Sequence, residues 1–211
     1  MTLVLNRSTR SARKPKGGGH ERRGEILAAA TRIFNSDGYD GATIRRIADE
    51  VGLSSTALYM HFRDKDEILV EICQGAMEQL LTLAAQIAAQ EKPAADRARD
   101  MIEAYIRFGL DNPSTYRLVF CSHGRHLSPE SQAPVEILGD RCFQKLHNVV
   151  AEIAEQGRLK SPGALVATQV LWSAGHGLVS LMITQPDRQW APAPVLTAAL
   201  LDGIFDGVLR A

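Results

Sequence analysis

The feature that most constrains this chain is the stretch from Ala42 to Phe62. In residues 43–51 apolar side chains recur at the i, i+3, i+4, i+7 spacing of one helix face, and Leu58 and Phe62 stand four residues apart. Between these segments Gly52 allows a backbone angle that other residues resist, and a serine shortly after it can cap the second helix. The stretch therefore predicts a helix-turn-helix, whose second helix normally enters the DNA major groove.

A helix is expected on each side of this motif. Residues 21–37 carry apolar groups on one face, and Gly38 fits the left-handed position that ends a helix. Further on, Asp64 and Glu67 resemble a capping box that opens a long helix to about Gln90. The first helix would pack across the two helices of the helix-turn-helix and complete a three-helix DNA-binding unit. The long helix would couple that unit to the rest of the chain.

The remaining sequence predicts more helices and no β-strand. Helical spacing, interrupted by proline and glycine, gives the segments 93–110, 114–120, 135–156, 162–185 and 194–210. Residues 121–134 contain one glycine, two prolines and several polar side chains, which indicates a loop or partly ordered lid. The expected fold class is all-α, with an N-terminal three-helix helix-turn-helix DNA-binding domain and a C-terminal helical bundle.

Charge divides the chain near the end of the DNA-binding unit. Residues 1–66 contain 12 Lys and Arg against 8 Asp and Glu, whereas residues 67–211 contain 12 against 16. Residues 1–66 therefore have a net charge of +4, which suits binding to DNA phosphates. Residues 67–211 have a net charge of −4, which does not. We expect a disordered basic arm over 1–19 and a DNA-binding domain over 20–66. The arm either adds phosphate or minor-groove contacts or is a solvated leader.

The cysteines and the N-terminal residues indicate in which cellular compartment the protein is expected. Three cysteines without paired spacing argue against a secreted disulfide framework, and residues 1–5 are too short an apolar segment for a signal peptide. Residues 163–184 are uncharged over a membrane-spanning length, but polar side chains at helical spacing disfavour lipid. These side chains are Gln169, Ser173, His176, Ser180 and Thr184. We expect a cytoplasmic protein without a membrane segment.

One short segment has the composition of a metal site. Cys121, His123 and His126 offer a thiol and two imidazoles, and His147 is a candidate fourth ligand. No second cluster has diagnostic spacing, so a loop with uncoordinated side chains is the simpler interpretation. The chain also lacks a nucleophile motif, a phosphate-binding glycine loop and a metal–carboxylate signature. The sequence therefore predicts no enzyme activity, no cofactor and no metal.

The N-terminal block resembles the tetracycline-repressor (TetR) family of bacterial transcriptional regulators. The matching residues are Ile26-Leu27-Ala28-Ala29-Ala30, Phe34, Gly38-Tyr39, Thr43-Ile44, Ile47-Ala48, Val51-Gly52-Leu53-Ser54, Leu58-Tyr59, Phe62 and Lys65-Asp66-Glu67-Ile68-Leu69. Residues 112–120 and 172–177 are similar to a C-terminal domain type named for its Trp, His and Gly. The resemblance implies about nine helices, a homodimer through the last two, and a ligand-binding and dimerisation domain over 67–211.

The resemblance also assigns residues to DNA. Thr43 matches a position that bonds a phosphate, and Arg45 matches one that often reaches a base edge, where arginine suits guanine. The expected DNA-contacting set is Thr43, Arg45, Arg46, Ser54, Ser55, Thr56, Tyr59, His61 and Lys65. The family often has a basic residue at position 55 and glycine at 56, so Ser55 and Thr56 shift base readout toward the two arginines.

Aromatic and polar side chains in the second half are candidate ligand contacts. They are Tyr105, Phe108, Tyr116, Phe120, Gln169, Trp172 and His176. Gly175 and Gly177 flank His176 and weaken a helix unless something packs closely against them, for which a helix of a second subunit is the expected partner.

The predicted function is a ligand-responsive transcriptional regulator. It would be a repressor that a small apolar or amphipathic effector releases from a palindromic DNA operator. Two alternatives stay open, namely a non-specific DNA architectural protein that binds mainly through the basic arm, and an all-α enzyme or metal-binding protein.

Overall fold

The structure, a computed structural model, describes residues 19–122, 128–160 and 162–210. These residues form nine α-helices and one π-helix, and no β-strand occurs among them. In chain order the elements are α1 (Gly19–Gly41), α2 (Ile44–Glu50), α3 (Ser55–Tyr59), α4 (Lys65–Ala88), α5 (Ala94–Asp111), α6 (Pro113–Tyr116), η1 (Arg117–Ser122), α7 (Pro129–Glu155), α8 (Ala164–Thr184) and α9 (Ala193–Val208). The all-α prediction is confirmed.

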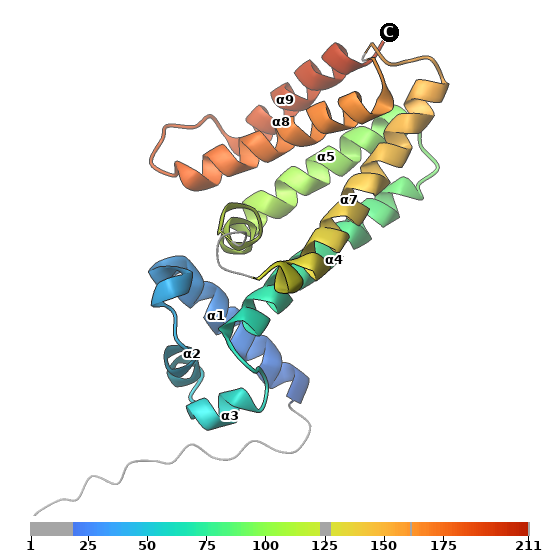
Figure 1. Ribbon diagram of the computed structural model, residues 1–211. Coiled ribbons are helices and arrows are strands. Elements are labelled where there is room, and N and C mark those ends of the chain that lie inside the picture. The colour runs from blue at the N-terminus through green and yellow to red at the C-terminus, as the bar shows by residue number, and fades with distance from the viewer. Residues whose placement is uncertain (1–18, 123–127, 161, 211) are drawn as a thin grey trace, which may run out of the picture.

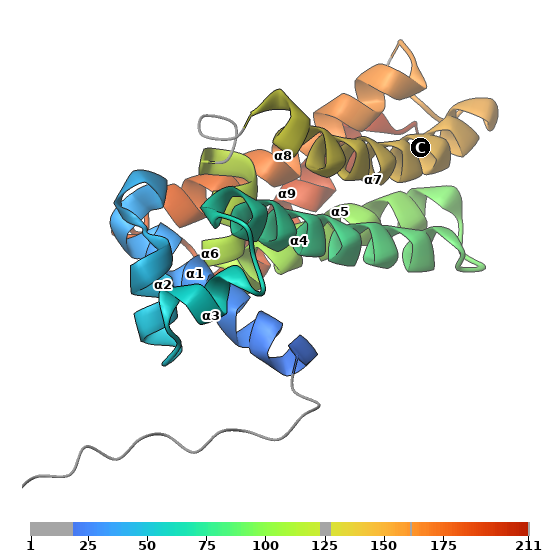
Figure 2. The same cartoon turned by 60° about the horizontal axis from the view of Figure 1, so that its bottom comes forward.

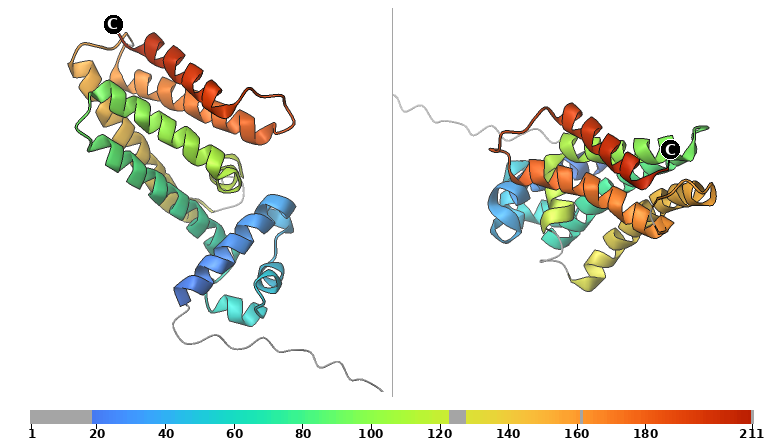
Figure 3. Two further views of the ribbon diagram at one scale, coloured as in Figure 1. Left: turned by 180° about the vertical axis from the view of Figure 1, so that it is seen from behind. Right: turned by 90° about the horizontal axis from the view of Figure 1, so that it is seen from above.

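The helices form two connected groups (Figure 1). The first three lie together at one end, and α4 runs from them into a bundle with α5, α7, α8 and α9. Within the bundle α4 and α7 pack side by side, α5 lies in the middle, and α8 and α9 form the opposite side (Figure 3). The short α6 and η1 lie at the end of the bundle that meets α1 (Figure 2). The long helix α4 is therefore common to both groups.

Side-chain caps fix where the N-terminal helices begin. The hydroxyl of Thr43 accepts from the N–H of Arg46 at the start of α2, and the hydroxyl of Ser54 accepts from the N–H of Ala57 at the start of α3. Asp64 caps α4 in the same way. Each bond satisfies an N–H group that has no partner inside its helix. The caps therefore fix the residue at which each of these three helices begins.

Two glycines have the backbone angles that the sequence required. Gly52 in the turn between α2 and α3 has φ 68°, and Gly38 has φ 74°. Gly38 interrupts the helical backbone of α1, after which a short turn continues to Gly41. The ring of Tyr39 then folds back and stacks on that of Phe34, with the ring centroids 5.7 Å apart. This fold-back closes the apolar face of α1 over the helix-turn-helix.

Two clusters of buried apolar side chains stabilise the fold. The first joins α1, α2 and α3 to the first half of α4, and Ile47, Leu58 and Ile68 are completely buried in it. The same cluster takes in residues from α5, η1 and α7, which are Phe108, Leu118, Val119 and Val135. The second cluster lies among α5, α7, α8 and α9. The core around the helix-turn-helix therefore continues past residue 66 into the bundle.

The structure corrects two helix boundaries. α7 begins at Pro129, six residues earlier than predicted, with Ser128 as its cap. Pro134 had suggested a break, but it lies inside the helix, where its missing N–H removes one backbone bond without ending the element. The segment predicted as one helix over 114–120 is divided into α6 and the π-helix η1. Periodicity alone does not distinguish these helix types.

For α8, the sequence predicted that Gly175 and Gly177 contact a second subunit and that the helix does not span a membrane. A Cβ on Gly175 would lie 3.1 Å from a methyl of Ile102 on α5, so the expected contact with a second subunit is wrong for this glycine. Gly177 has no atom within 4 Å of a Cβ position. By length and composition α4 and α8 are each apolar enough to cross a membrane, but both pack within the bundle.

Candidate DNA-binding surface and ligand cavity

The helix-turn-helix presents one exposed surface at the end of the molecule remote from the bundle (Figure 1). Thr43, Ser54 and Thr56 lie at or near the N-termini of α2 and α3 and are exposed, while Ser55 is half-buried. Tyr59 is 54% exposed although it is a large aromatic residue. Backbone N–H groups and hydroxyls at helix N-termini suit phosphate oxygens. The surface therefore has the chemistry to bind a nucleic-acid backbone.

The two arginines of α2 differ in how free they are. The Arg45 side chain is 86% exposed, and its only carboxylate neighbour among the described residues is Asp49, at 3.9 Å. The Arg46 guanidinium forms an ion pair with Asp37 of α1, with the nitrogen 2.5 Å from the carboxylate oxygen. Arg46 would have to leave this pair to reach a base. Arg45 is therefore the better placed of the two for base readout.

His61 and Lys65 are held by the protein itself. The carbonyl of His61 accepts from Arg23, whose guanidinium also pairs with Glu71 and lies 4.0 Å from the centre of the Phe62 ring. The ammonium of Lys65 donates to the carbonyl of Tyr39 at 2.9 Å. It also lies 4.1 Å from the centre of the Tyr39 ring. These contacts tie α1 to α3 and α4, so both positions contribute to the rigidity of the surface.

One exposed side chain was missed by the sequence reasoning. Met60, directly after α3, is 84% exposed, more than any other large apolar residue among those described. The signal was available, because Met60 falls between Tyr59 and His61 and opposite the buried Leu58. It extends the surface formed by α3 with an apolar group.

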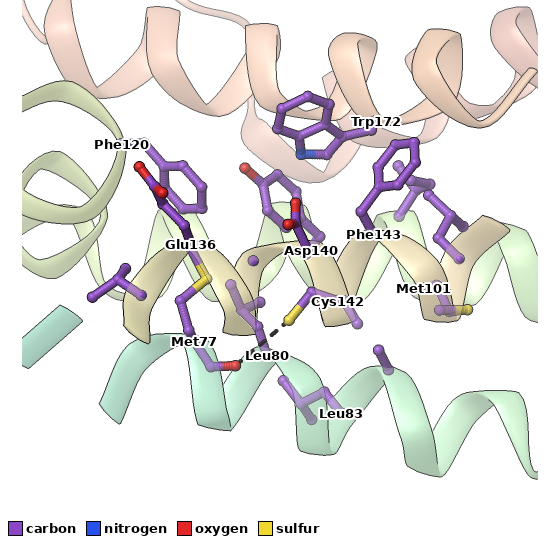
Figure 4. Close-up of a pocket in the computed structure, with 17 residues that line it drawn as sticks. Met77, Leu80, Leu83, Met101, Phe120, Glu136, Asp140, Cys142, Phe143 and Trp172 are labelled. Atoms are coloured by element: carbon purple, nitrogen blue, oxygen red, sulfur yellow. Dashed lines mark hydrogen bonds between the residues drawn. The ribbon is translucent and has the colours of Figure 1, made fainter. Parts of the chain in front are cut away.

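A cavity of about 390 Å³ opens between α4, α5, α7 and α8. Its wall is mostly aliphatic and aromatic, and Figure 4 shows Trp172 of α8 facing the α4 side chains across the space. The lining residues are Met77, Leu80, Leu83, Ala84, Met101, Ile102, Ala104, Tyr105, Phe120, Val135, Glu136, Gly139, Asp140, Cys142, Phe143, Leu146 and Trp172. Burial raises the pKa of the Cys142 thiol to about 11, so this thiol stays neutral. Such a cavity is of a size that suits a small ligand.

Behind Tyr105 lies a hydrogen-bonded cluster of three side chains. The hydroxyls of Tyr105 and Tyr116 are 2.9 Å apart, and they lie 3.0 Å and 2.7 Å from Nδ1 of His176. The other ring nitrogen of His176 is 3.3 Å from the hydroxyl of Ser180. We assign Nε2 as the protonated nitrogen, because Nδ1 then accepts the closer phenol proton, that of Tyr116. The cluster connects the cavity wall to α6.

The structure brings together only some of the residues expected to contact ligand. Tyr105, Phe120 and Trp172 line the cavity, while Tyr116 and His176 lie behind them in the hydrogen-bonded cluster. Phe108 does not line the cavity, because its side chain points into the core beneath the helix-turn-helix. Gln169 is exposed on α8 and does not line it either. Helical spacing shows which residues of α5 and α8 share a face, but it does not show which face meets the cavity.

Sequence reasoning missed the contributions of α4 and α7 to this wall. The apolar spacing of α4 does not distinguish residues that face a cavity, such as Met77, Leu80 and Leu83, from residues of the core. The one available signal was on α7, where Glu136 and Asp140 interrupt an otherwise apolar face four residues apart.

The histidine of the cluster gives a pH prediction. Burial lowers the pKa of His176 below its usual 6.5, so the unfolded chain takes up a proton more readily than the folded one. The free energy of unfolding should therefore fall as the pH drops through 6.5. Thermal unfolding measured at about pH 7.5 and about pH 5.5 should show a smaller drop for His176→Asn than for the wild type. Equal drops would show that His176 does not contribute.

The candidate metal-binding segment that the sequence analysis disfavoured falls largely outside the described residues. His123 and His126 are not described, and Cys121 is an exposed free cysteine. In the part of the chain that is described, no three His, Cys, Asp or Glu side chains are grouped so that they could hold a metal ion.

Known proteins resemble both parts of the chain. Residues 26–72 match the family described as bacterial regulatory proteins, tetR family, and residues 98–203 match the family described as tetracyclin repressor-like, C-terminal domain. The transcriptional activator FasR of Mycolicibacterium smegmatis is 28% identical over 157 residues, which are 71% of this chain and 71% of FasR. The transcriptional repressor AcnR of Corynebacterium jeikeium is 38% identical over 65 residues, 31% of this chain and 34% of AcnR.

Among solved structures, the TetR-family regulator PfmR from Thermus thermophilus is similar over most of its length. The comparison covers 90% of this chain and 98% of PfmR, with a TM-score of 0.74 and 28% identity. Two family matches that together span the helix-turn-helix and the bundle agree with the fold and with the exposed surface of α2 and α3. The chain therefore belongs to the TetR family of bacterial regulatory proteins and is a ligand-responsive, DNA-binding transcriptional regulator.

Proposed function

We propose that this protein is a cytoplasmic repressor that binds a palindromic operator as a homodimer and is released by a small apolar or amphipathic effector. The DNA-contacting residues would be those predicted from the sequence, with Arg45 reading a base edge and Thr43, Ser54, Thr56 and Tyr59 contacting the backbone. Residues 20–66 would act as the DNA-binding domain and 67–211 as the ligand-binding and dimerisation domain. The protein would act by binding and would catalyse no reaction.

The exposed faces of α8 and α9 support dimerisation through the last two helices. Val166, Val170 and Leu181 on α8 are 43–46% exposed, and Val195 on α9 is 59% exposed. Gly177 on α8 and two glycines of α9 have no atom within 4 Å of a Cβ position, so another helix could approach closely there. An apolar face of this kind on a regulator suits a second copy, because a two-fold dimer presents two recognition helices to two half-sites.

The effector proposal rests on one observation: α4 is part of both the helix-turn-helix core and the cavity wall. In α4, Ile68, Leu69 and Ile72 pack against the helix-turn-helix, and Met77, Leu80 and Leu83 line the cavity. The π-helix η1 is shared in the same way, since Phe120 lines the cavity while its neighbours Leu118 and Val119 pack in the core beneath α1. If α4 can take up more than one position, a ligand that fits one of them better would make that position more populated. The distance between the recognition helices of the two subunits would change with it.

That shift would matter because the operator fixes the spacing. Half-sites of a palindrome lie about 34–36 Å apart, and a dimer whose recognition helices no longer match this distance loses one set of contacts. The effector would thus weaken DNA binding without touching DNA.

The test begins with an operator selected from genomic fragments by the purified protein. Arg45→Ala should weaken binding by about 1–3 kcal/mol, roughly 5- to 150-fold, and relax specificity at one base pair. Tyr59→Ala should weaken binding across all sequences. Gel-shift titrations at one fixed salt concentration measure both effects. Unchanged operator affinity in both variants would refute the proposed surface.

Arg141→Ala is the matched control. Arg141 is exposed on α7, a helix of the bundle that packs against α4, α5 and α8, and its loss changes the net charge as much as the loss of Arg45 does. It should leave operator affinity nearly unchanged.

The alternatives predict different results. An architectural protein would bind unrelated duplexes with near-equal affinity at fixed salt. A metal-binding protein would retain stoichiometric metal when purified without a histidine tag.

A further inference from the structure

We propose that the effector is a hydrophobic cation, a molecule with an apolar body and a positively charged group, and that the charge lies against Glu136 and Asp140. The inference rests on the proposed function of the cavity as an effector site. It adds the charge of the ligand, which neither the fold nor the likeness to other regulators specifies.

The body of the ligand must be apolar, because most of the cavity wall is. Aliphatic side chains from α4 and α5, together with the ring of Phe143, form its surface. The hydroxyl of Tyr105 is already engaged by Tyr116 and His176. A polar group placed deep in such a wall would lose its bonds to water without gaining new ones.

Two carboxylates set the charge at the edge of the cavity. Glu136 and Asp140 stand four residues apart on α7, which puts them on the same face of that helix. Figure 4 shows both carboxylates directed from α7 toward the side where Phe120 and Trp172 lie. Both residues are exposed, and neither forms an ion pair or hydrogen bond with a residue that the structure describes.

Within the described part of the wall, no cation offsets these charges. None of the described lining residues is Lys, Arg or His. Two uncompensated carboxylates repel an anionic head group and attract a cationic one. An acid with an apolar tail would therefore meet the wrong sign of charge at this edge of the cavity.

The aromatic rings that line the same cavity add to the same preference. Trp172 and Phe143 meet edge to face, with centroids 6.1 Å apart, and both rings line the cavity, as does the ring of Phe120. The faces of such rings carry negative potential and attract cations within about 6 Å. Ring faces and carboxylates thus favour the same charge, and a quaternary ammonium fits them without needing a hydrogen-bond acceptor.

A series of three ligands with one tail tests the charge alone. Decyltrimethylammonium, decan-1-ol and decanoate are titrated into the intact protein at concentrations below those that form micelles, and binding is followed by calorimetry. We expect the ammonium to bind about tenfold or more tightly than decanoate, with the alcohol between them. The ammonium should also release operator DNA in a gel-shift titration.

A double variant locates the effect. Glu136→Gln with Asp140→Asn should weaken binding of the ammonium about tenfold and leave binding of the alcohol unchanged. Glu78→Gln with Glu155→Gln is the matched control, because these exposed carboxylates on α4 and α7 do not line the cavity. It removes the same charge and should have little effect on either ligand.

The outcomes separate this inference from the proposed function. Decanoate binding as tightly as the ammonium, or a double variant that binds the ammonium like the wild type, overturns the inference on charge. If the alcohol binds and releases DNA in either case, the cavity remains an effector site. Failure of all three ligands to bind would instead overturn the cavity as an effector site, and the inference with it.

Discussion

Replacing Val170 with aspartate is expected to separate the proposed dimer into monomers and to lower operator affinity by about 100- to 10,000-fold. Val170 is 44% exposed in the middle of the apolar face of α8. In a two-fold dimer the substitution occurs twice at one interface, and burying two unpaired carboxylates is costly. Each monomer would then bind one half-site without the gain that comes from linking two. Sedimentation velocity measures the mass, and gel-shift titration measures the affinity.

Ile137→Asp provides the matched control for this experiment. Ile137 is 58% exposed on α7, so it is an equally apolar surface residue outside the faces of α8 and α9. This variant should remain dimeric and bind the operator like the wild type. A Val170→Asp variant that sediments as a dimer would show that the subunits meet through another surface. Dissociation caused by Ile137→Asp would point to α7 as that surface.

Replacing Tyr116 with alanine is expected to lower the free energy of unfolding by about 3–5 kcal/mol, as for other buried aromatic side chains. Tyr116 is completely buried, and its ring packs 4.6 Å from that of Phe120, between their centroids. Gly109 of α5 lies directly beneath the ring, since a Cβ there would come within 2.9 Å of it. A cavity at this position would therefore loosen α6 and η1 together. Urea titration at one fixed protein concentration measures the change.

Tyr116→Phe distinguishes packing from hydrogen bonding at the same site. It keeps the ring and removes only the hydroxyl that reaches Nδ1 of His176, so we expect a loss of about 1 kcal/mol. Equal losses in both variants would mean that the hydroxyl, and not the packing of the ring, stabilises this region. A loss below about 1 kcal/mol for Tyr116→Ala would contradict the packing account altogether.

The N-terminal helices could be predicted closely because their determinants are local. Gly52 requires a positive φ, Ser54 and Asp64 cap the helices that follow them, and the spacing of apolar residues gives the buried faces. Each of these signals acts within one or two helical turns. The α7 boundary was missed for the corresponding reason. A proline inside a helix looks locally like a break, and only the packing of α7 along α4 shows that the helix continues through Pro134.

The candidate sites show the same difference between what local sequence determines and what tertiary packing determines. The sequence by itself determined an all-α chain with a helix-turn-helix and the residue types of a DNA-binding surface, because capping, turn geometry and helical periodicity depend on neighbours in the chain. Only the tertiary structure decided that Asp37 closely engages Arg46, whereas Arg45 has only the more distant Asp49 beside it, and that Phe108 turns away from the cavity. It also decided that Glu136 and Asp140 border the cavity. Those outcomes depend on which helix faces meet in space, and residues far apart in the sequence determine them together.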